Sequence, residues 1–478
     1  MSRSINTRDN APQEFTENLN SISNEEDEFD EVTIVPQPDP HAMGANLSDP
    51  YALMNFIKGN IGTGVLSMPV VLRYAGLWTG FFMILFAGII ATYLMNVLVR
   101  TSRSVRQRHN LDRSKMDYTE TVFYVFKYGP EKLRKPKGKI KHMVNVFLIV
   151  TQLGFTCVYI LFLTQNIRYF IYGLYPSLWL DFYIVGFLVC LCLIPMCLCG
   201  NMRVFAMMSM LANFATLLGS AFIFAYLFTS GLKSVTSLPV ITEPRGILIA
   251  FSIVMYSYEG ISLVLPIESK MATPEYYIHP FGVLNIGMTI IIVWNLAFGF
   301  FGYLKFGEHA QGSITLNIPE IPYWFSPVKP LFIFAIVVSY LLQFYVPATI
   351  FARLMEKLRC HREGSEWKRY VNLKLMRVGL VLFSYLMVIS IPELDLMISL
   401  IGAFASSFLL FILPPVLELV HLWDRRSTIP RFWLCVFAKH LIIIGLGLLS
   451  FVGGTIATVW QLIDAFGKPD EPIATLME

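Results

Sequence analysis

The sequence KGNIGTGVLSMP at residues 58–69 decides how the chain is organised. It lies inside an apolar run from about 51 to 74, which is long enough to cross a bilayer because a spanning helix needs about 20 residues. Gly59, Gly62 and Gly64 crowd into this run, and each glycine weakens a helix interior by about 1 kcal/mol relative to alanine. Backbone groups that are freed in hydrocarbon survive only where they line a cavity. The pattern therefore predicts a membrane helix that is unwound from Gly59 to Gly64.

An unwound segment of this kind offers a binding site for an anionic group. The helix that restarts after the glycines has N–H groups without intrahelical partners, and its dipole places positive charge there. A carboxylate fits such a position, and broken helices at the membrane midplane are typical of substrate sites in secondary transporters. The candidate substrate contacts in this segment are Gly59, Asn60, Ile61, Gly62, Thr63 and Gly64.

The composition indicates an integral membrane protein. Hydrophobic residues make up 55% of the 478 residues and charged residues only 15%, whereas a soluble domain carries about 25% charged residues. The mean hydropathy is +0.58. Nucleic-acid binding is excluded because the chain has no compact basic domain outside the loops between apolar runs. No nucleophile motif, phosphate loop or metal-ligand spacing is present, so we expect neither an enzyme nor a metal site.

Hydropathy predicts about eleven transmembrane helices in an all-α polytopic protein. Residues 1–48 are polar and acidic and are predicted to form a disordered tail, residues 49–460 the transmembrane domain, and residues 461–478 a short second tail. After the first, broken helix the expected spans are 77–100, 142–164, 179–199, 204–229, 245–267, 280–304, 328–352, 374–391, 395–417 and 433–460.

The distribution of basic residues predicts the orientation. The loops that would face the same side as residues 1–48 contain 26 Lys and Arg, and the segments of the other side contain 7. Loops rich in Lys and Arg remain in the cytosol. The N-terminal tail is therefore predicted to be cytosolic and the C-terminus to lie outside the cell or in a lumen.

A second interruption falls in the sixth run, FSIVMYSYEGISLVLPIESKM at residues 251–271. Glu259 lies in its middle, where a carboxylate costs about 2.5–3.5 kcal/mol on insertion scales and should face a cavity or a partner. Gly260 follows directly and Pro266 comes soon after. If helices one to five and six to ten are inverted repeats, helices one and six occupy equivalent positions and the two breaks mark one site. The alternative is a kinked helix with a structural acid.

Other polar residues on the apolar runs are candidates to line the same cavity. For each of them, a purely structural hydrogen bond between helices is the alternative. Lys58 is either a lysine that extends to the membrane surface or an ion-pairing, gating residue. The further substrate-site candidates are Gln152, Tyr159, Ser257, Tyr258, Gly260, Tyr340, Gln343 and Ser406.

The loop after the second span predicts a helix at the cytosolic surface. Asp117 precedes Glu120 by three residues, as in a capping box, and Val122, Phe123 and Phe126 form an apolar face. The basic segment that follows, 127–141, is expected to lie over anionic lipid headgroups. A solvated loop that only sets the topology is the alternative.

Several stretches resemble one known family, the proton-coupled amino acid transporters of the amino acid/auxin permease superfamily. The resemblance runs in order from about residue 50 to 460 and implies a LeuT-like 5+5 repeat with one extra C-terminal helix, and symport of small neutral amino acids by alternating access at lysosomal, endosomal or plasma membranes. The matching stretches are KGNIGTGVLSMP (58–69), TQLGFTCVYILF (151–162), YEGISLVLPIESKM (258–271), GFFGYLKFG (299–307), LLQFYVPA (341–348) and ISLIGAFASSFLLFILPPVLEL (398–419).

The chain departs from the family pattern at Asn55. Family members commonly carry a histidine at this position, three residues before the lysine of the first motif, and that histidine is implicated in proton coupling. Asn55 does not titrate. Either Glu259 or another acid then carries the proton, or coupling is weak or absent. No cofactor is expected other than the proton as coupling ion.

Two functions remain open from the sequence. In a symporter, the N–H groups of Gly59 to Gly64 with Thr63 would bind the substrate carboxylate, and carbonyl groups around Ser257 to Gly260 would bind its ammonium group. In a sensor, the same pocket would bind the amino acid while residues 1–48 or the basic loop 353–377 signal to a cytosolic partner with little flux. A channel is disfavoured because no ring of repeated charges is present.

Overall fold

A computed structural model describes residues 47–135, 137–178, 180–198, 202–229, 231–319, 323–356 and 365–467. The predicted tail falls almost wholly outside these ranges. The described residues form helices and contain no strand, and Leu47 and Met271 make an isolated parallel bridge. Besides short 3₁₀ turns, the helices are α2 (Asp49–Asn60), α3 (Thr63–Leu66), α4 (Met68–Ala75), α5 (Leu77–His109), α6 (Tyr118–Lys127), α7 (Glu131–Arg134), α8 (Lys137–Leu174), α9 (Phe182–Leu198), α10 (Met202–Thr229), α11 (Pro244–Ser257), α12 (Ile261–Lys270), α13 (Val283–Phe306), α14 (Val328–Glu356), α16 (Glu366–Ser390), α17 (Leu394–Ile401), η7 (Gly402–Ile412), α18 (Leu413–Leu422), η9 (Phe432–Ala438), α19 (Lys439–Leu448), η10 (Leu449–Gly454) and α20 (Thr455–Gly467).

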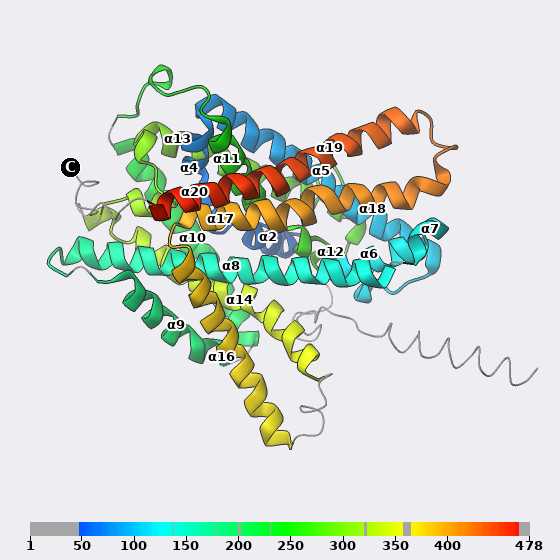
Figure 1. The fold of residues 1–478 in the computed structure, drawn as a ribbon, viewed down its shortest axis with the longest axis horizontal. Helices are drawn as coiled ribbons and strands as arrows, with labels where there is room; N and C mark the ends of the chain where they lie inside the picture. The colour runs from blue at the N-terminus through cyan, green and yellow to red at the C-terminus, as the bar shows by residue number, and fades with distance from the viewer. Residues whose placement is uncertain are drawn as a thin grey trace, which may run out of the picture.

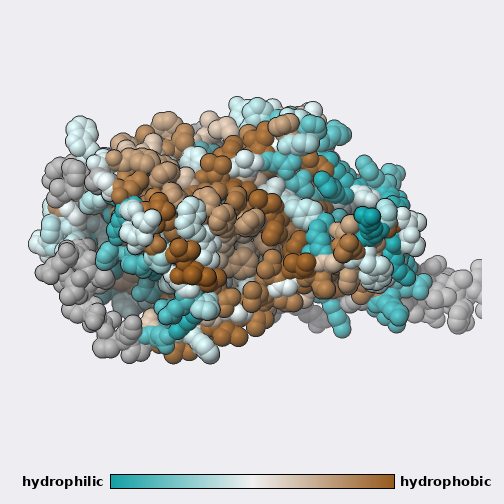
Figure 2. All heavy atoms as spheres, turned by 90° about the horizontal axis from the view of Figure 1, so that it is seen from above, coloured by the Kyte–Doolittle hydropathy of each residue, from teal (hydrophilic) through white to brown (hydrophobic). Residues whose placement is uncertain are grey.

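The helices confirm a polytopic membrane protein. Nine helical stretches in the described part of the chain are long and apolar enough to cross a bilayer. Helix α9, with 17 residues, is a shorter apolar helix, and the first apolar run is divided among α2, α3 and α4. The surface shows a hydrophobic band across its middle with hydrophilic residues toward both ends (Figure 2). The total of eleven spans and the inverted repeat remain predictions.

Several helices extend beyond the predicted spans. Helix α5 continues to His109 rather than ending near 100, α18 continues to Leu422 rather than 417, and α20 ends at Gly467 rather than 460. Hydropathy marks only the part of a helix that crosses hydrocarbon. The helix itself continues into the polar region because its backbone hydrogen bonds are internal.

The long helices run roughly along the long axis of the molecule (Figure 1). Helices α6 and α7 lie at one end, and the last helix, α20, ends toward the other. We call the first the basic end, because the Lys- and Arg-rich segment 100–141 belongs to it. Helices α9, α14 and α16 pack against α8 on one side of the bundle. Helix α4 packs against both α11 and α13.

Helix α6 begins with the predicted cap. The carboxylate of Asp117 accepts a hydrogen bond from the N–H of Glu120 at 2.7 Å. Val122, Phe123 and Phe126 are buried, and α6 packs against α8 and α18. The apolar face therefore inserts into the basic end of the bundle, where Glu120 forms an ion pair with Lys141 at 2.9 Å.

The buried cap predicts a pH-dependent stability. Burial raises the pKa of Asp117 to about 7, and the nearby charge of Glu120 adds to this, while the N–H of Glu120 and the ammonium of Lys141 partly offset it. Between about pH 4 and 7 the folded state holds a proton that the unfolded state, with a pKa near 3.9, has released. Stability therefore falls as pH rises through this window. In Asp117→Asn we therefore expect the unfolding temperature to fall less as pH rises through this window.

Glu131→Gln is the control for that experiment, since Glu131 is an exposed residue of the same loop. Thermal unfolding of the purified protein in detergent across the window measures both variants. An identical pH profile for Asp117→Asn and the unaltered chain would contradict the assignment.

Candidate functional site

The first apolar run is broken, as predicted, but over a shorter stretch. Helix α2 ends at Asn60, and α3 begins at Thr63. Between them Ile61 is extended (φ −88°, ψ 104°), and Gly62 is not helical (φ −140°, ψ −149°). The N–H of Ile61 still reaches the carbonyl of Ile57 at 2.8 Å. The interruption is therefore limited to Ile61 and Gly62, within the predicted range of Gly59 to Gly64.

The second predicted break is also present. Helix α11 ends at Ser257 and α12 begins at Ile261, with Tyr258, Glu259 and Gly260 between them. Glu259 is 6% exposed. Its two carboxylate oxygens have no hydrogen-bond partner in the described part of the chain. A buried acid without partners is costly when ionised, so this residue needs a proton or an arriving partner.

The two breaks lie against each other. A Cβ atom on Gly64 would come within 2.8 Å of the Cα atom of Ser257, and one on Gly260 would overlap the side-chain amide of Asn60. The hydroxyls of Thr63 and Tyr256 are 3.0 Å apart. Glycine is therefore required where the two segments approach most closely, and the two breaks are adjacent in the fold.

A small cavity lies at this contact. Its volume is about 20 Å³, which is room for little more than one water molecule. An amino acid does not fit in this volume. The lining residues are Gly59, Asn60, Gly62, Thr63, Gly64, Phe155, Tyr159, Tyr256, Ser257, Glu259 and Gln343.

Most residues predicted for the site line this cavity, and several lie just outside it. Ser406 adjoins Glu259 and, like it, has no partner among the described residues. Gln152 is buried, and its Oε1 also lacks a partner there. The hydroxyl of Tyr258 instead donates to the carbonyl of Ile84 at 3.0 Å. These placements leave the roles of the residues as predictions.

The remaining candidates do not line the cavity. Tyr340 is fully buried, its ring stacks on Phe344, and its hydroxyl lies beside Cys197. Asn55 and Lys58 on α2, and Ile61 in the first break, are partly buried. Gly260, in the second break, packs against Asn60.

The sequence did not single out Phe155 and Tyr256, which line the cavity. The centres of their rings are 4.7 Å apart. Phe155 lies three residues after Gln152 and four before Tyr159, and residues at such spacings share one helix face. That spacing was the available signal for Phe155. Tyr256 had none, because an aromatic residue within an apolar helix is ordinary core.

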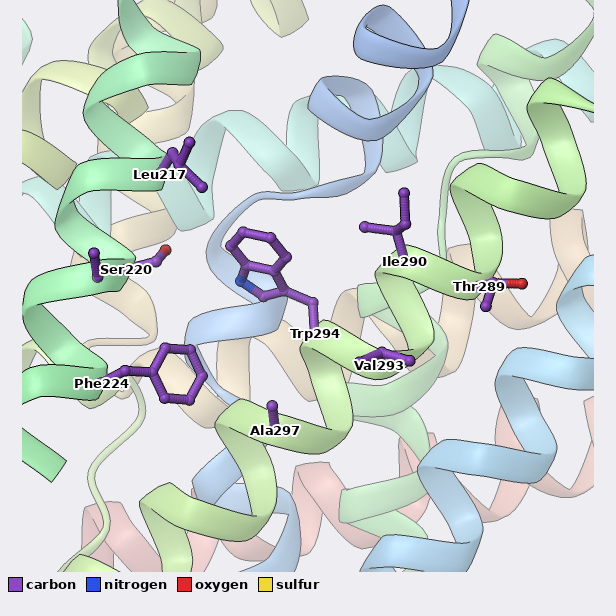
Figure 3. A pocket seen from close by; sticks show the side chains of 9 residues that line it. Leu217, Ser220, Phe224, Thr289, Ile290, Val293, Trp294 and Ala297 are labelled. Atoms are coloured by element: carbon purple, nitrogen blue, oxygen red, sulfur yellow. The ribbon is translucent and has the colours of Figure 1, made fainter. Parts of the chain in front are cut away.

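A larger hollow of about 430 Å³ lies elsewhere, between α10 and α13. Figure 3 shows Leu217, Ser220 and Phe224 on one helix facing Ile290 and Trp294 on the other. Its lining is almost wholly apolar. A zwitterionic ligand would lose hydration there without compensation, so we do not assign the substrate to it.

The comparisons with known proteins decide the family. The family described as transmembrane amino acid transporter protein matches residues 45–460. The chain belongs to this transporter family. It is 30% identical over 445 residues to the proton-coupled amino acid transporter-like protein pathetic of Drosophila melanogaster, covering 90% of the chain and 89% of that protein. It is 26% identical over 465 residues to the probable amino acid transporter skat-1 of Caenorhabditis elegans, covering 96% of the chain and 99% of that protein.

In this member of the transporter family, polar contacts join α4 and the residue before it to distant segments. Arg73, on α4, forms an ion pair with Asp395 on α17 at 3.2 Å and donates to the carbonyl of Ala310 at 2.5 Å. The Tyr74 hydroxyl donates to the same carboxylate at 2.7 Å. The Ser67 hydroxyl donates to the carbonyl of Gly312 at 2.6 Å. One half of the broken helix is thereby joined to two other segments.

A second set of ionic contacts lies at the basic end. Glu268, at the end of α12, is 2% exposed and pairs with Arg103 at 3.0 Å and Arg106 at 3.6 Å on α5. Arg113 donates to the carbonyls of Glu268 and Met271 at 2.5 and 2.8 Å. These contacts tie the end of α12 to α5 and to Arg113.

Asp395→Asn tests the ion pair between Arg73 and Asp395. We expect a loss of roughly 1–3 kcal/mol in unfolding free energy, because hydrogen bonds to a charged group are removed in a partly buried setting. Asp464→Asn is the control, since its ion pair with Arg245 is more exposed and such pairs contribute about 0.2–1 kcal/mol. Unfolding midpoints of the two variants measure the difference. Equal effects would show that the Arg73 pair contributes no more than a surface contact.

Proposed function

We propose that the chain is a symporter that moves small neutral amino acids across a membrane by alternating access, driven by protons. The observation that carries this proposal is the pair of helix breaks that meet at one closed cavity. Membership of the transmembrane amino acid transporter family supports amino acids as the substrate class. The membrane we expect is lysosomal, endosomal or plasma membrane, with the basic end in the cytosol and segment 127–141 on anionic lipids.

The lining of the cavity suits a zwitterion. The first turn of a helix has unpaired N–H groups, and α3 begins at the cavity with Thr63 and Gly64. These amides and the Thr63 hydroxyl would hold the carboxylate. The carbonyls of the last turn of α11 would hold the ammonium group. The lining side chains include no basic residue and one acid, Glu259, so a neutral side chain is favoured.

The size of the lining residues favours a small substrate. Three glycines and the rings of Phe155, Tyr159 and Tyr256 surround the cavity. The rings must move to admit even a small amino acid, and each added methylene requires further displacement of closely packed neighbours. A long or branched side chain is therefore disfavoured.

Glu259 is the candidate for coupling at the cavity. Ionised, it would lie in the cavity wall without a hydrogen-bond partner among the described residues, so proton loss should accompany a change in its surroundings. A proton that moves down two pH units supplies about 2.7 kcal/mol. One proton per substrate then sustains a gradient of roughly a hundredfold.

Uptake by the purified protein in liposomes tests the proposal. A panel of radiolabelled amino acids is offered with the outside at pH 5.5 or 7.5 and the inside at pH 7.5. We expect accumulation of glycine, alanine, serine or proline that is larger with the acidic outside. Uptake without pH dependence would remove the proton from the proposal. Absence of uptake and of exchange across the whole panel would remove transport.

Sensing is a second candidate, favoured by how residues 47–49 are attached. The N–H of Leu47 donates to the carbonyl of Lys270 at 2.9 Å, and the N–H of Ala272 donates to the carbonyl of Leu47 at 3.1 Å. Thr273 donates to the Asp49 carboxylate at 2.7 Å. A movement of α12 would therefore be transmitted to the start of the tail. Amino-acid-dependent capture of cytosolic proteins by residues 1–48, without flux in liposomes, would favour this function.

A further inference from the structure

A second buried acid–base cluster lies away from the cavity, where α5, α18 and α19 meet (Figure 1). Glu418 and His440 are the two members on α18 and α19, with Oε2 and Nε2 only 2.6 Å apart. The Tyr93 hydroxyl, on α5, is 3.4 Å from each of these atoms. The His440 side chain is 1% exposed and that of Glu418 is 20% exposed. The cluster is thus almost completely enclosed on the histidine side.

The geometry of His440 specifies how many protons the pair holds. Its Nδ1 lies 2.6 Å from the carbonyl oxygen of Val436. A carbonyl only accepts, so Nδ1 carries a hydrogen. The short contact between Nε2 and the Glu418 oxygen then needs one more proton, either on the ring or on the carboxyl group. Without that proton two lone pairs would face each other at 2.6 Å, which is repulsive.

We propose that Glu418 and His440 form a proton-binding site whose occupancy controls the contact between α18 and α19. With its proton bound, the pair holds the two helices together. When the Nε2–H bond breaks and the proton passes to water, the carboxylate and the neutral ring no longer attract at this distance, and the contact loosens. The inference rests on the proposed proton-driven transport and adds the residues of a second coupling site, distinct from Glu259.

Helix α18 and the segment before it link this pair to the cavity. Helix α18 continues without interruption from η7, a π-helical segment. Ser406, which adjoins Glu259, lies in η7. It is twelve residues before Glu418, which corresponds to about 18 Å along a helix. A shift of α18 against α19 therefore moves a residue beside the cavity acid, and π-helical turns are frequent at functional sites.

Charged neighbours favour a pair that cycles between one proton and none. Tyr93 faces the pair from α5, and Arg100 of the same helix lies near the Tyr93 hydroxyl. On α19, the ammonium group of Lys439 lies 4.4 Å from the centre of the Tyr93 ring. On α18, His421 lies near Glu418, and the cations around His421 are Arg108 and Arg425. This excess of positive charge opposes a second proton and stabilises Glu418 after the first has left.

Measuring amino acid exchange and accumulation separately distinguishes a loss of proton coupling from a loss of structure. Full-length His440→Gln and Glu418→Gln are reconstituted with a trapped pH-sensitive dye and an equimolar mixture of radiolabelled glycine, alanine, serine and proline. Exchange at equal pH needs no net proton transfer, so we expect it to stay within about threefold of the unaltered chain. Accumulation driven by a pH difference and the matching dye signal should fall by at least about tenfold, because coupling is a free-energy link between two sites.

Ser450→Ala is the matched control, since the Ser407 and Ser450 hydroxyls also join two helical segments, η7 and η10, at 2.7 Å and without a titratable group. It should retain both exchange and accumulation. Glu418→Asp, which keeps the acid, should restore accumulation with a shifted pH midpoint. Undiminished accumulation in both glutamine variants would overturn the inference. A parallel loss of exchange and accumulation in these variants would also overturn it. So would a failure of both glutamine variants to fold, if Glu418→Asp then shows an unshifted pH midpoint. If the unaltered chain accumulates nothing, the proposed function fails instead.

Discussion

Gly64→Ala is expected to lower the rate of amino acid transport at least about tenfold and to destabilise the fold by roughly 1–3 kcal/mol, the usual cost of overpacking. The added methyl group would lie 2.8 Å from the Cα atom and 3.0 Å from the Cβ atom of Ser257. A backbone atom cannot rotate away as a side-chain tip does. The two helix breaks must therefore separate, and the cavity between them loses its geometry. Uptake rates and unfolding temperatures of the purified variant measure the two effects.

Gly445→Ala is the matched control for this prediction. It makes the same chemical change on another membrane helix, where a Cβ atom would meet nothing within 4 Å. Its transport should be unchanged, and its stability should rise by up to about 1 kcal/mol because alanine favours a helix over glycine. Normal transport by Gly64→Ala would show that the contact of the two breaks is not required.

Glu259→Gln is expected to lower proton-driven accumulation at least about tenfold and to remove its pH dependence, because the amide has nearly the same shape but does not titrate. Glu259 is buried in the wall of the cavity without a hydrogen-bond partner among the described residues. Losing a carboxyl group there removes an uncompensated buried acid, so the variant should unfold at an equal or higher temperature. Accumulation with the outside at pH 5.5 and 7.5, together with thermal unfolding, measures both effects.

Glu243→Gln provides the comparison, since Glu243 precedes the same helix, α11, but is exposed. It should transport like the unaltered chain at both pH values. If Glu259→Gln keeps both the uptake and its pH dependence, Glu259 is not the coupling residue, and the proton must act elsewhere in the chain.

Much of the fold was predictable because the solvent for most of this chain is a bilayer. An apolar run in hydrocarbon must satisfy its backbone internally, so its length and composition are sufficient to predict a helix. The same rule made Gly59 to Gly64 and Glu259 conspicuous. This rule did not predict the extent of the first break, which is limited to Ile61 and Gly62. The helical hydrogen bond of Ile61 persists although Gly59 and Asn60 precede it.

The site residues divide in the same way. Residues within the two breaks were predictable, because glycines and an acid are unusual in a membrane helix. Phe155 and Tyr256 were not, because a ring in an apolar helix looks the same whether it faces a cavity or a neighbouring helix. The pairing of Glu418 with His440 was also hidden. Hydropathy ended the tenth span before Glu418, whereas α18 continues through it to Leu422.

The order of residues is enough to predict that the chain crosses a membrane as helices and that two of them are interrupted, because bilayer thickness and the cost of unpaired backbone act on each segment separately. Folding in three dimensions was needed to show that the breaks touch, that the cavity between them holds little more than a water molecule, and that Glu418 meets His440. Those facts depend on distances between segments far apart in the chain. Only packing sets such distances.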